Sequence, residues 1–567
     1  MRPARRDVLR VAGAAALLGL GAACARIPTD TPVSSRPLTG QTQPGAPYVQ
    51  ALPPAEGATA EEVAAGFVQA GVGSEENFAV ARHYLTEEAS ASWEPDAMIT
   101  IFSGSQELTV KEVGSGRLAI VLQAVALIDE HGVRRTLAAP ASREVEVSVA
   151  EVDGQWRLSE VPDGIYLSEA TFETLYSAAR LYFLDARERH LVPDHRWFPL
   201  RRGASAVLEA LGKGPSAFLE GAVTNQVPRT SGVSLAATTT GLDGTAQITV
   251  PAAIANLEDG PRTSALSQLE ASLRSLRSLS EVRLVRDGQD VVLDEDRRIE
   301  RALPGHRPIA AGPRGVISLS ELDSSSPAAQ LVPAFAKLEV SAPVIAQDGV
   351  LAAALDTEGS SVLIATTDDS VPLRKAATGG SFVAPRVDDS GYVWTSIRSS
   401  AGALLALSGE GPDRDAKVDA PWLIGRDVEG LDIAADATRM IVLSSDGAGA
   451  RVDLCAVVRD ADGVPSSLTD PRTVRTFLTD VKQVVWYDEV ALLMLGTEPT
   501  ADERRAQILD FAGGRESLPS LVAGTHRIAG SVVAEAVWAG TVDGRLLRSD
   551  GEGWSLVEQE GRDPSFY

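Results

Sequence analysis

The sequence predicts a multidomain chain in which two α+β domains precede an all-β propeller of five or six blades. Its 567 residues correspond to three or four domains at about 150 residues each. Over the first half of the chain, segments with helical spacing of apolar residues alternate with strand-like segments. From about residue 308 onward, short strands and turns recur roughly every 40 to 50 residues, which is typical of propeller blades.

The composition limits which partners the chain can have. The formal net charge is −25 and the isoelectric point is about 4.7, so the average field repels polyanions and we expect no nucleic-acid partner. Hydrophobic residues make up 44% and charged residues 23%, as in ordinary globular proteins. The two cysteines, Cys24 and Cys455, exclude a disulfide framework.

Residues 1–23 are predicted to be an export signal, because arginines precede an apolar run over residues 11–23. That run is shorter than the stretch of about 20 apolar residues that a transmembrane helix needs. It ends in the small residues Gly21–Ala23 directly before Cys24. The pattern resembles a bacterial lipobox, which implies cleavage after Ala23 and attachment of a diacylglycerol to the Cys24 sulfur.

Two alternatives stay open at this terminus. Gly21 stands where a lipobox usually carries leucine, so a signal peptide with an incidental cysteine is the competing interpretation. Arg5 and Arg6 are similar to a twin-arginine export motif, but a general basic segment fits equally well. Removing residues 1–23 takes away three net positive charges and leaves −28 on the exported part. Residues 24–58, rich in proline, are expected to form a flexible tether.

Residues 59–165 are predicted to form an α+β domain. A capping box at Thr59–Glu62 begins a helix, and a second helical stretch runs toward Trp93. Strands are expected over residues 118–128 and 144–149 and, after the turn at Asp153-Gly154, over residues 155–158. This order resembles the NTF2-like or cystatin-like sandwich of bacterial envelope proteins. Such folds often enclose a concave pocket, but no catalytic set can be placed in this one.

Residues 166–307 are predicted to form a second α+β domain. Strands around residues 180–185 and 246–250 alternate with helices, the first of which ends at the stop Gly212-Lys213-Gly214-Pro215. The last strand, over residues 282–286, runs into the turn Asp287-Gly288. This succession resembles the GerMN domain, known from sporulation and germination proteins and from exported lipoproteins.

Residues 308–567 are predicted to form the propeller. We expect the strand at Gly315–Ser320 to pair with the last strands and so close the ring, which removes exposed sheet edges. The tryptophans of the repeats are expected to pack between blades. They are Trp394, Trp486 and Trp538.

The sequence contains no motif that signals catalysis, a cofactor or a metal. The six histidines are scattered, and the nucleophile-elbow, Walker and dinucleotide signatures are missing. A metal site is conceivable at His190 and His195, with Asp185 and Asp194 nearby, but an exposed strand–loop edge is the preferred interpretation. Acidic turns such as Asp388-Asp389 are expected to be solvated, and Cys455 to be a buried, inert thiol. We therefore predict no catalytic, cofactor-binding or metal-binding residues.

The order of lipobox, tether, helix-plus-sheet domain, GerMN-like domain and propeller resembles the actinobacterial LpqB lipoprotein family. The segments "ARHYLTEEASASW" and "GQWRLSEVPDG" contribute to this resemblance. It implies a palmitate-bearing, non-enzymatic accessory of the MtrAB two-component system, anchored on the extracytoplasmic face of the cell membrane. Its partner would be the extracytoplasmic domain of the histidine kinase MtrB, and its role would lie in envelope homeostasis and division. Cys24 is the one functional position that the resemblance transfers.

Two other functions remain open from the residues alone. An envelope enzyme, such as a propeller hydrolase or lyase acting on cell-wall glycan, would need carboxylates that converge on the propeller channel. A glycan- or lipid-binding chaperone would use the pocket of the first domain. The leading hypothesis is a surface-anchored binding and regulatory protein, because propellers and pocketed sandwiches offer broad binding surfaces.

Overall fold

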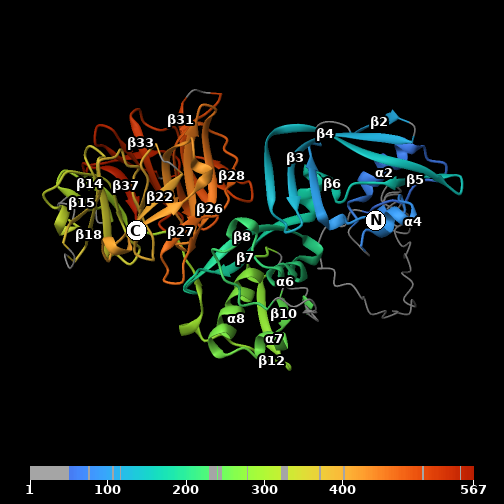
Figure 1. Cartoon of the computed structure of the whole chain (residues 1–567), viewed down its shortest axis with the longest axis horizontal. Helices are drawn as coiled ribbons and strands as arrows, with labels where there is room; N and C mark the ends of the chain where they lie inside the picture. The colour runs from blue at the N-terminus through green and yellow to red at the C-terminus, as the bar shows by residue number, and fades with distance from the viewer. Residues whose placement is uncertain are drawn as a thin grey trace, which may run out of the picture. The chain divides into compact units, whose positions relative to one another are not determined.

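The computed structural model describes most of the chain from residue 50 onward (Figure 1). The predicted signal, Cys24 and most of the predicted tether therefore lie outside the described residues. The described residues are 50–567 except for 74–76, 105–107, 115, 229–238, 241–244, 278, 321–329, 369–371, 400–401, 501–502 and 550.

The N-terminal domain packs short helices on a strongly curved sheet. Helix α2 (Ala60–Ala70) begins with the predicted capping box, in which the Thr59 hydroxyl accepts from the Glu62 amide and the Glu62 carboxylate accepts from the Thr59 amide. The second helical stretch is split into α3 (Ala79–Arg82) and α4 (Glu87–Ser92).

The sheet of this domain has the strand order β5-β4-β3-β1-β6, with β2 on β3. Its pairs are antiparallel except β1–β6, which is parallel. The 3-10 helix η1 (Pro95–Ala97) precedes β1. The strands are β1 (Met98–Phe102), β2 (Thr109–Gly114), β3 (Arg117–Asp129), β4 (Arg134–Val152), β5 (Gln155–Glu160) and β6 (Ile165–Ser168).

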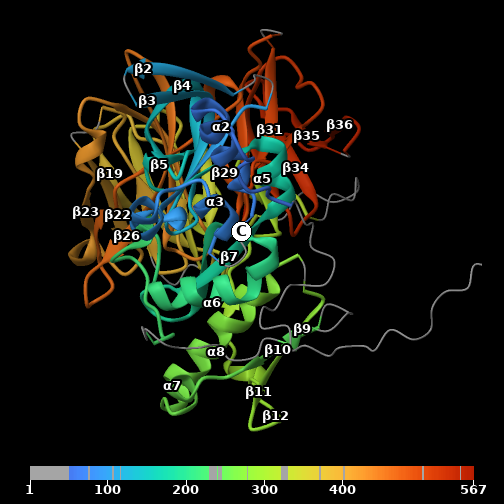
Figure 2. The same cartoon turned by 90° about the vertical axis from the view of Figure 1, so that its right-hand side faces the viewer.

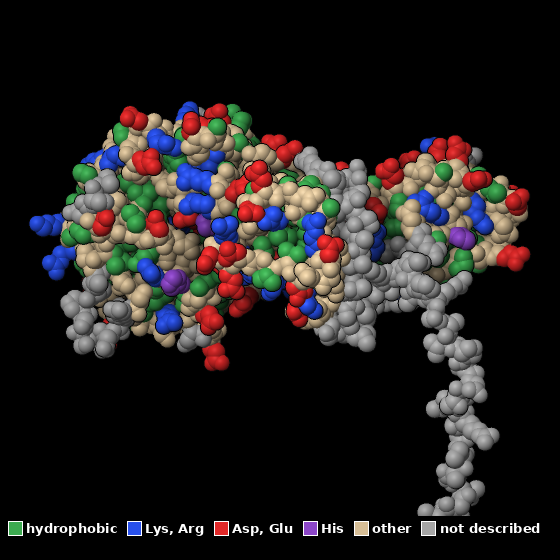
Figure 3. Space-filling model, turned by 90° about the horizontal axis from the view of Figure 1, so that it is seen from below, with side chains coloured by type: hydrophobic (Ala, Val, Ile, Leu, Met, Phe, Trp, Pro, Cys, Tyr) green, Lys and Arg blue, Asp and Glu red, His purple; other side chains and the backbone are tan. Residues whose placement is uncertain are grey.

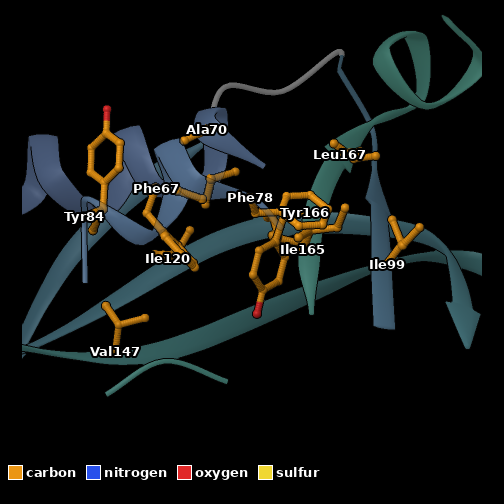
Figure 4. Close-up of a cluster of buried hydrophobic side chains, with 14 of the residues drawn as sticks. Phe67, Ala70, Phe78, Tyr84, Ile99, Ile120, Val147, Ile165, Tyr166 and Leu167 are labelled. Atoms are coloured by element: carbon orange, nitrogen blue, oxygen red, sulfur yellow. The ribbon is translucent and has the colours of Figure 1, made fainter. Parts of the chain in front are cut away.

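Apolar side chains fill the space between the helices and the sheet (Figure 4). Phe67 of α2 lies over Ile120 of β3, and the ring of Trp93 meets Phe67 edge-on at 5.2 Å between centroids. Tyr166 and Phe78 belong to the same cluster. The side of the sheet that could have formed a ligand pocket is therefore occupied here by the domain's own core.

The middle domain has two small sheets and two main helices. One sheet has the order β13-β8-β7 and the other β12-β11-β10-β9. Figures 1 and 2 both show α8 beside the strands β10–β12. Helix α5 (Glu169–Leu175) precedes this domain and packs its Phe172 into the N-terminal core. The helices of the middle domain are η2 (Leu200–Arg202), α6 (Gly203–Lys213), η3 (Ala217–Leu219), α7 (Ala252–Ala255), α8 (Asp259–Arg274) and η4 (Glu295–Arg297). The strands are β7 (Tyr176–Leu184), β8 (His190–Pro199), β9 (Thr239–Thr240), β10 (Thr245–Thr249), β11 (Glu281–Arg286), β12 (Gln289–Asp290) and β13 (Glu300–Arg301).

The sequence signals of this domain act as predicted. Helix α6 ends at Gly214, whose φ of 100° is open to glycine but strained for other residues.

Side chains of α8 form hydrogen bonds with the backbone of β7, which lies at a sheet edge. The Ser272 hydroxyl accepts from the Tyr182 amide at 2.9 Å, and the Gln268 amide group donates to the Tyr182 carbonyl at 2.9 Å. These bonds fix the helix against the strand.

The rest of the described chain forms a β-propeller whose sheets make up six blades. The third and fourth blades are joined into one nine-stranded sheet, because β27 pairs with both β23 and β26. The first blade has β14 (Pro308–Gly312), β15 (Gly315–Ser318) and β37 (Arg562–Phe566), and the second has β16 (Val340–Ile345), β17 (Leu351–Asp356), β18 (Ser361–Thr366) and β19 (Arg374–Thr378). The third has β20 (Arg386–Val387), β21 (Tyr392–Thr395), β22 (Ala403–Ser408) and β23 (Ala416–Asp419), and the fourth has β24 (Asp427–Ile433), β25 (Arg439–Asp446), β26 (Gly449–Arg459), β27 (Pro465–Leu468) and β28 (Arg472–Val474). The fifth has β29 (Thr479–Asp488), β30 (Ala491–Thr497), β31 (Arg504–Asp510) and β32 (Arg515–Ser517), and the sixth has β33 (Thr525–Ser531), β34 (Ala536–Thr541), β35 (Leu546–Ser549) and β36 (Trp554–Val557). Short 3-10 helices connect some strands: η5 (Pro333–Phe335), η6 (Pro412–Arg414) and η7 (Pro421–Leu423).

The ring closes differently from the sequence prediction. Strand β14 pairs antiparallel with the final strand β37, whereas the predicted closing strand at Gly315–Ser320 forms β15 and pairs with β14 instead. The prediction was wrong because the short run at Pro308–Gly312 carries no alternation that distinguishes it from a linker. Closure still joins the two ends of the propeller sequence in one blade.

The three tryptophans are buried between blades, as predicted. Trp486 on β29 donates its indole N–H to the Asp432 carbonyl of the neighbouring blade at 3.3 Å. Trp394 is fully buried and donates to the Asp388 carboxylate at 2.8 Å. Trp538 packs with Ala310 and Ile317 of the first blade. Each indole therefore helps to hold its blade against other parts of the ring.

Candidate functional site

The centre of the propeller contains a small cavity of about 120 Å³. Its walls come from the inner strands of the blades, including Ile345, Ile433 and Ile528, and from the C-terminal residues 564–567. The Tyr567 amide and the Arg307 carbonyl are hydrogen-bonded at 3.1 Å, which holds the chain end in place. The cavity is too small for a glycan, because ligand pockets usually enclose about 300–1,000 Å³.

Asp432 is the one acidic side chain among the described lining residues of this cavity. Burial raises its pKa, and the Arg386 guanidinium, with Nε at 2.9 Å from Oδ1, opposes that shift. Its other oxygen accepts from the Trp486 amide at 2.8 Å. General acid–base hydrolysis needs two carboxylates on either side of a substrate, so this channel gives no support to a glycan-cleaving enzyme.

A buried carboxylate links the middle domain to the propeller. Glu489, between β29 and β30, has a side chain that is only 2% exposed. Its Oε1 accepts from Arg180 at 2.6 Å, from the Tyr182 hydroxyl at 3.0 Å and from Arg301 at 3.0 Å. The Glu489 carbonyl also accepts from Arg439 at 2.6 Å. Charge-assisted bonds of this kind are strong and directional, so the cluster fixes one domain on the other.

A second polar contact joins the same two parts of the chain. His190 Nε2 lies 2.9 Å from the Asp389 carboxylate, and Arg189 donates to the Asp389 carbonyl at 2.8 Å. The hydrogen bond to Asp389 raises the pKa of His190 in spite of partial burial. Burial acts to raise the pKa of Asp389, but the bond from His190 and the charge of Arg189 lower it overall. The acidic turn predicted to be solvated is therefore part of an interface.

The edge at residues 190–195, predicted to be exposed, is buried over residues 191–195, and His190 is half-buried. Asp194 is inaccessible to solvent, and its carboxylate accepts from Arg196, from the Ser216 amide and from the Ser216 hydroxyl. His195 is 8% exposed, and burial together with the charge of Arg472 lowers its pKa to about 3. Sequence reasoning missed this burial because Ser216, which binds Asp194, and Arg472, whose charge acts on His195, lie far from this strand in the chain.

The remaining predicted positions are structural where they are described. Asp185 accepts from the amides of Arg189 and His190 and so shapes the turn between β7 and β8. Burial and the charge of Asp453 raise the pKa of the Cys455 thiol, as expected for an inert group. Across the described part of the chain, no group of three or more histidine, cysteine or acidic side chains is placed to hold a metal ion.

Sequence reasoning also missed Glu489 and Asp432. Both lie in ordinary strand-end segments, and their arginine partners belong to other blades or to the middle domain. No local spacing could have identified them, because each partner is fixed by the fold and not by the neighbouring sequence.

The outer surface carries acidic, basic and hydrophobic side chains side by side. On the face in Figure 3, acidic and basic side chains are interspersed and hydrophobic side chains form small patches between them. Such a surface suits reversible protein contacts, which are about as polar as the rest of a protein surface. Within the described ranges, no helix is long and apolar enough to cross a membrane.

Three family models match the chain, and none of them describes an enzyme. Residues 53–173 match "Lipoprotein LpqB, N-terminal domain", and residues 318–566 match "Lipoprotein LpqB beta-propeller domain". Residues 180–292 match the Germane model, described as "Sporulation and spore germination". The three matches follow the order of the three folded parts.

Relatives align with this chain along most of their own length. Lipoprotein LpqB of Cutibacterium acnes is 26% identical, with 88% of this chain and 87% of the relative covered. Lipoprotein LpqB of Bifidobacterium longum is 26% identical over 89% and 88% of the two chains. That of Streptomyces avermitilis is 23% identical over 99% and 98%. Among solved structures, a chain of a nidogen/laminin complex aligns with 46% of this chain and 97% of its own length, at 10% identity and a TM-score of 0.32.

Proposed function

We propose a membrane-tethered regulatory role for this chain, which belongs to the LpqB lipoprotein family. In this proposal the chain acts by binding and performs no catalysis. It is anchored through acylated Cys24 on the extracytoplasmic side of the cell membrane, and residues 24–58 separate the anchor from the folded domains. The proposed division into folded domains follows the sequence prediction, at residues 59–165, 166–307 and 308–567, with β6 (Ile165–Ser168) completing the sheet of the first domain.

The main support for a binding role is the small volume of the propeller channel and the pairing of its acidic side chain. The cavity of about 120 Å³ is bounded by the C-terminal residues, and its one described acidic side chain is paired with Arg386. A channel of this kind has neither room nor acid–base groups for glycan cleavage. The loops and outer faces of the blades are what remain available to a partner, and propellers commonly use such surfaces for protein contacts.

The proposed partner is the extracytoplasmic domain of an MtrB-type sensor histidine kinase. The family resemblance supports this choice, and a mixed polar surface suits a transient signalling contact. The chain would then modulate a two-component system that acts in envelope homeostasis and division. Its net charge of −28 without residues 1–23 would keep the folded body away from anionic lipids and leave it accessible to the kinase.

The test is direct binding between the two exported proteins. The mature lipidated chain in detergent should be retained by an immobilised MtrB extracytoplasmic domain from the same organism, with a Kd in the micromolar range that is typical of transient interfaces. The extracytoplasmic domain of an unrelated sensor kinase serves as the control. Absence of retention by the cognate domain, with a correctly lipidated and folded chain, would overturn the kinase partnership.

A further inference from the structure

The middle domain contains a second cavity, which is distinct from the propeller channel. Its volume is about 420 Å³, within the range of small-molecule sites. Strand β7, helix α8 and the segment 298–303 supply most of its walls. Hydrogen bonds join the backbone of Tyr182 to side chains of α8 and the backbone of Arg180 to Ser275, the residue after α8. They hold this strand against the helix, so the cavity is built on fixed elements.

Arginines dominate the charge of this cavity. Four arginines line it, against the two glutamates Glu270 and Glu300, although acidic residues outnumber basic ones in the whole chain by 77 to 52. Glu300 is exposed, so solvent screens its charge more than that of the buried Glu270. The four arginines are Arg180, Arg274, Arg298 and Arg301.

The arginines are arranged as two pairs, and each pair shares one carboxylate. Arg274 and Arg298 lie 2.9 Å and 3.4 Å from the Glu270 oxygens. Arg180 and Arg301 share the Glu489 Oε1 that also accepts from Tyr182. One carboxylate neutralises only one of two guanidiniums, so each pair keeps positive charge. A concave site with this excess attracts anions.

The guanidiniums also keep hydrogen-bonding capacity for a ligand. In each of these ion pairs the arginine approaches its carboxylate through one terminal nitrogen, whereas a guanidinium has five N–H donors. The four side chains are between 29% and 58% exposed, which leaves them accessible from the cavity. Planar guanidinium forks match the oxygens of phosphate groups.

We propose that this cavity binds a small anion that carries phosphate groups. The two arginine pairs would each hold part of the anion, so a ligand with two linked phosphates satisfies the site better than a single phosphate. The same chemistry is found in soluble phosphorylated compounds and in phospholipid head groups. This site is separate from the proposed kinase contact and does not depend on it.

The first experiment titrates inorganic pyrophosphate into the mature chain by calorimetry at low ionic strength. Binding is expected, and Arg274→Gln and Arg298→Gln should each weaken it about tenfold, because a charge-assisted bond contributes roughly that factor. Each variant leaves the other arginine on Glu270, so the buried carboxylate stays paired. Thermal unfolding of each variant verifies that it is folded.

The matched control is Arg283→Gln, which removes the same charge from an exposed pair with Asp290 in the same domain. It should change pyrophosphate affinity less than twofold. Equal weakening of pyrophosphate binding in the two site variants and in the control would mean general charge attraction and would overturn the site. Absence of binding at about 10 mM pyrophosphate would also overturn it. Arg298→Lys keeps the charge but loses the fork, so it should bind with intermediate affinity.

A second experiment distinguishes the two sources of phosphate. The non-lipidated Cys24→Ala chain is floated with phosphatidylcholine vesicles with and without phosphatidylglycerol. Pyrophosphate binding without flotation assigns the site to soluble anions. Flotation that requires phosphatidylglycerol and is lost in Arg298→Gln assigns it to head groups, and flotation that is unchanged in that variant would place membrane contact elsewhere and count against the head-group source.

Discussion

At the residue scale, the most informative side chains are buried charged groups that the fold pairs across long distances in sequence. Glu489 meets Arg180, 309 residues away, and Asp388 meets Arg459, 71 residues away. An unpaired buried charge would cost several kcal/mol, so these partners are needed for folding. A sequence displays the charges but not their partners, which is why Asp388-Asp389 and residues 190–195 were wrongly expected at the surface.

His195 should make stability depend on pH. Its pKa is about 3 in the folded protein against roughly 6.5 in the unfolded chain, so unfolding takes up a proton at acidic pH. The stability that this group contributes is complete above pH 6.5 or so and is lost as the pH falls toward 3, by about 1 kcal/mol per pH unit.

The measurement is the urea midpoint of wild type and His195→Gln between pH 7 and pH 4. The variant should show a shallower loss of stability on acidification, because glutamine takes up no proton on unfolding. His83→Gln, which replaces an exposed histidine, is the matched control and should follow the wild type. Identical slopes for wild type and His195→Gln would contradict this role of His195.

At the scale of elements, local signals were read correctly and remote pairings were not. The Thr59–Glu62 capping box, the stop at Gly214 and the alternation in β4 predicted their elements, because each signal lies within the element that it forms. The pairing of β14 with β37 could not be read in this way, since it joins two short strands from opposite ends of the propeller.

Gly305 should be essential to this closure. A Cβ at this position would overlap the main chain of Tyr567, so Gly305→Ala must displace the chain end that follows β37. We expect a fall of about 1–3 kcal/mol in the free energy of unfolding of the propeller, as for other overpacked positions.

Thermal unfolding and limited proteolysis of the last blade measure this effect. Gly430→Ala is the control, because a Cβ at Gly430 on β24 meets no atom within 4 Å. It should leave both the melting temperature and the cleavage pattern close to those of the wild type. A melting temperature for Gly305→Ala equal to that of Gly430→Ala would show that the chain end is not held as described.

At the scale of the whole molecule, the sequence was sufficient to predict the fold class and the order of the domains, but it did not predict the arginine-lined cavity. Composition, helical and strand periods and the repeat predicted two α+β domains and a propeller, and the family matches follow the same order. The arginine-lined cavity of the middle domain was not predicted, because its walls come from segments as distant as β7 and residues 298–303.

The proposed anchor can be tested on intact cells. Cys24→Ala should move the chain from the membrane fraction to the soluble fraction, because several acyl chains at about 0.8 kcal/mol per buried methylene provide the attachment. Immunoblots of washed membranes give the readout. Cys455→Ala removes the other cysteine, which is buried in the propeller, and should stay in the membrane fraction. Retention of Cys24→Ala in washed membranes would contradict lipid anchoring.

The pairing of β14 with β37 also has a consequence for the order of events during biosynthesis. The residues of β37 follow every other strand of the propeller in the chain, so the ring cannot close until they have been synthesised. The two domains that precede the propeller can fold earlier, since neither of their core clusters includes a residue of the propeller. Until β37 is in place, the first blade lacks its third strand, and chaperones would have to shield its open edge.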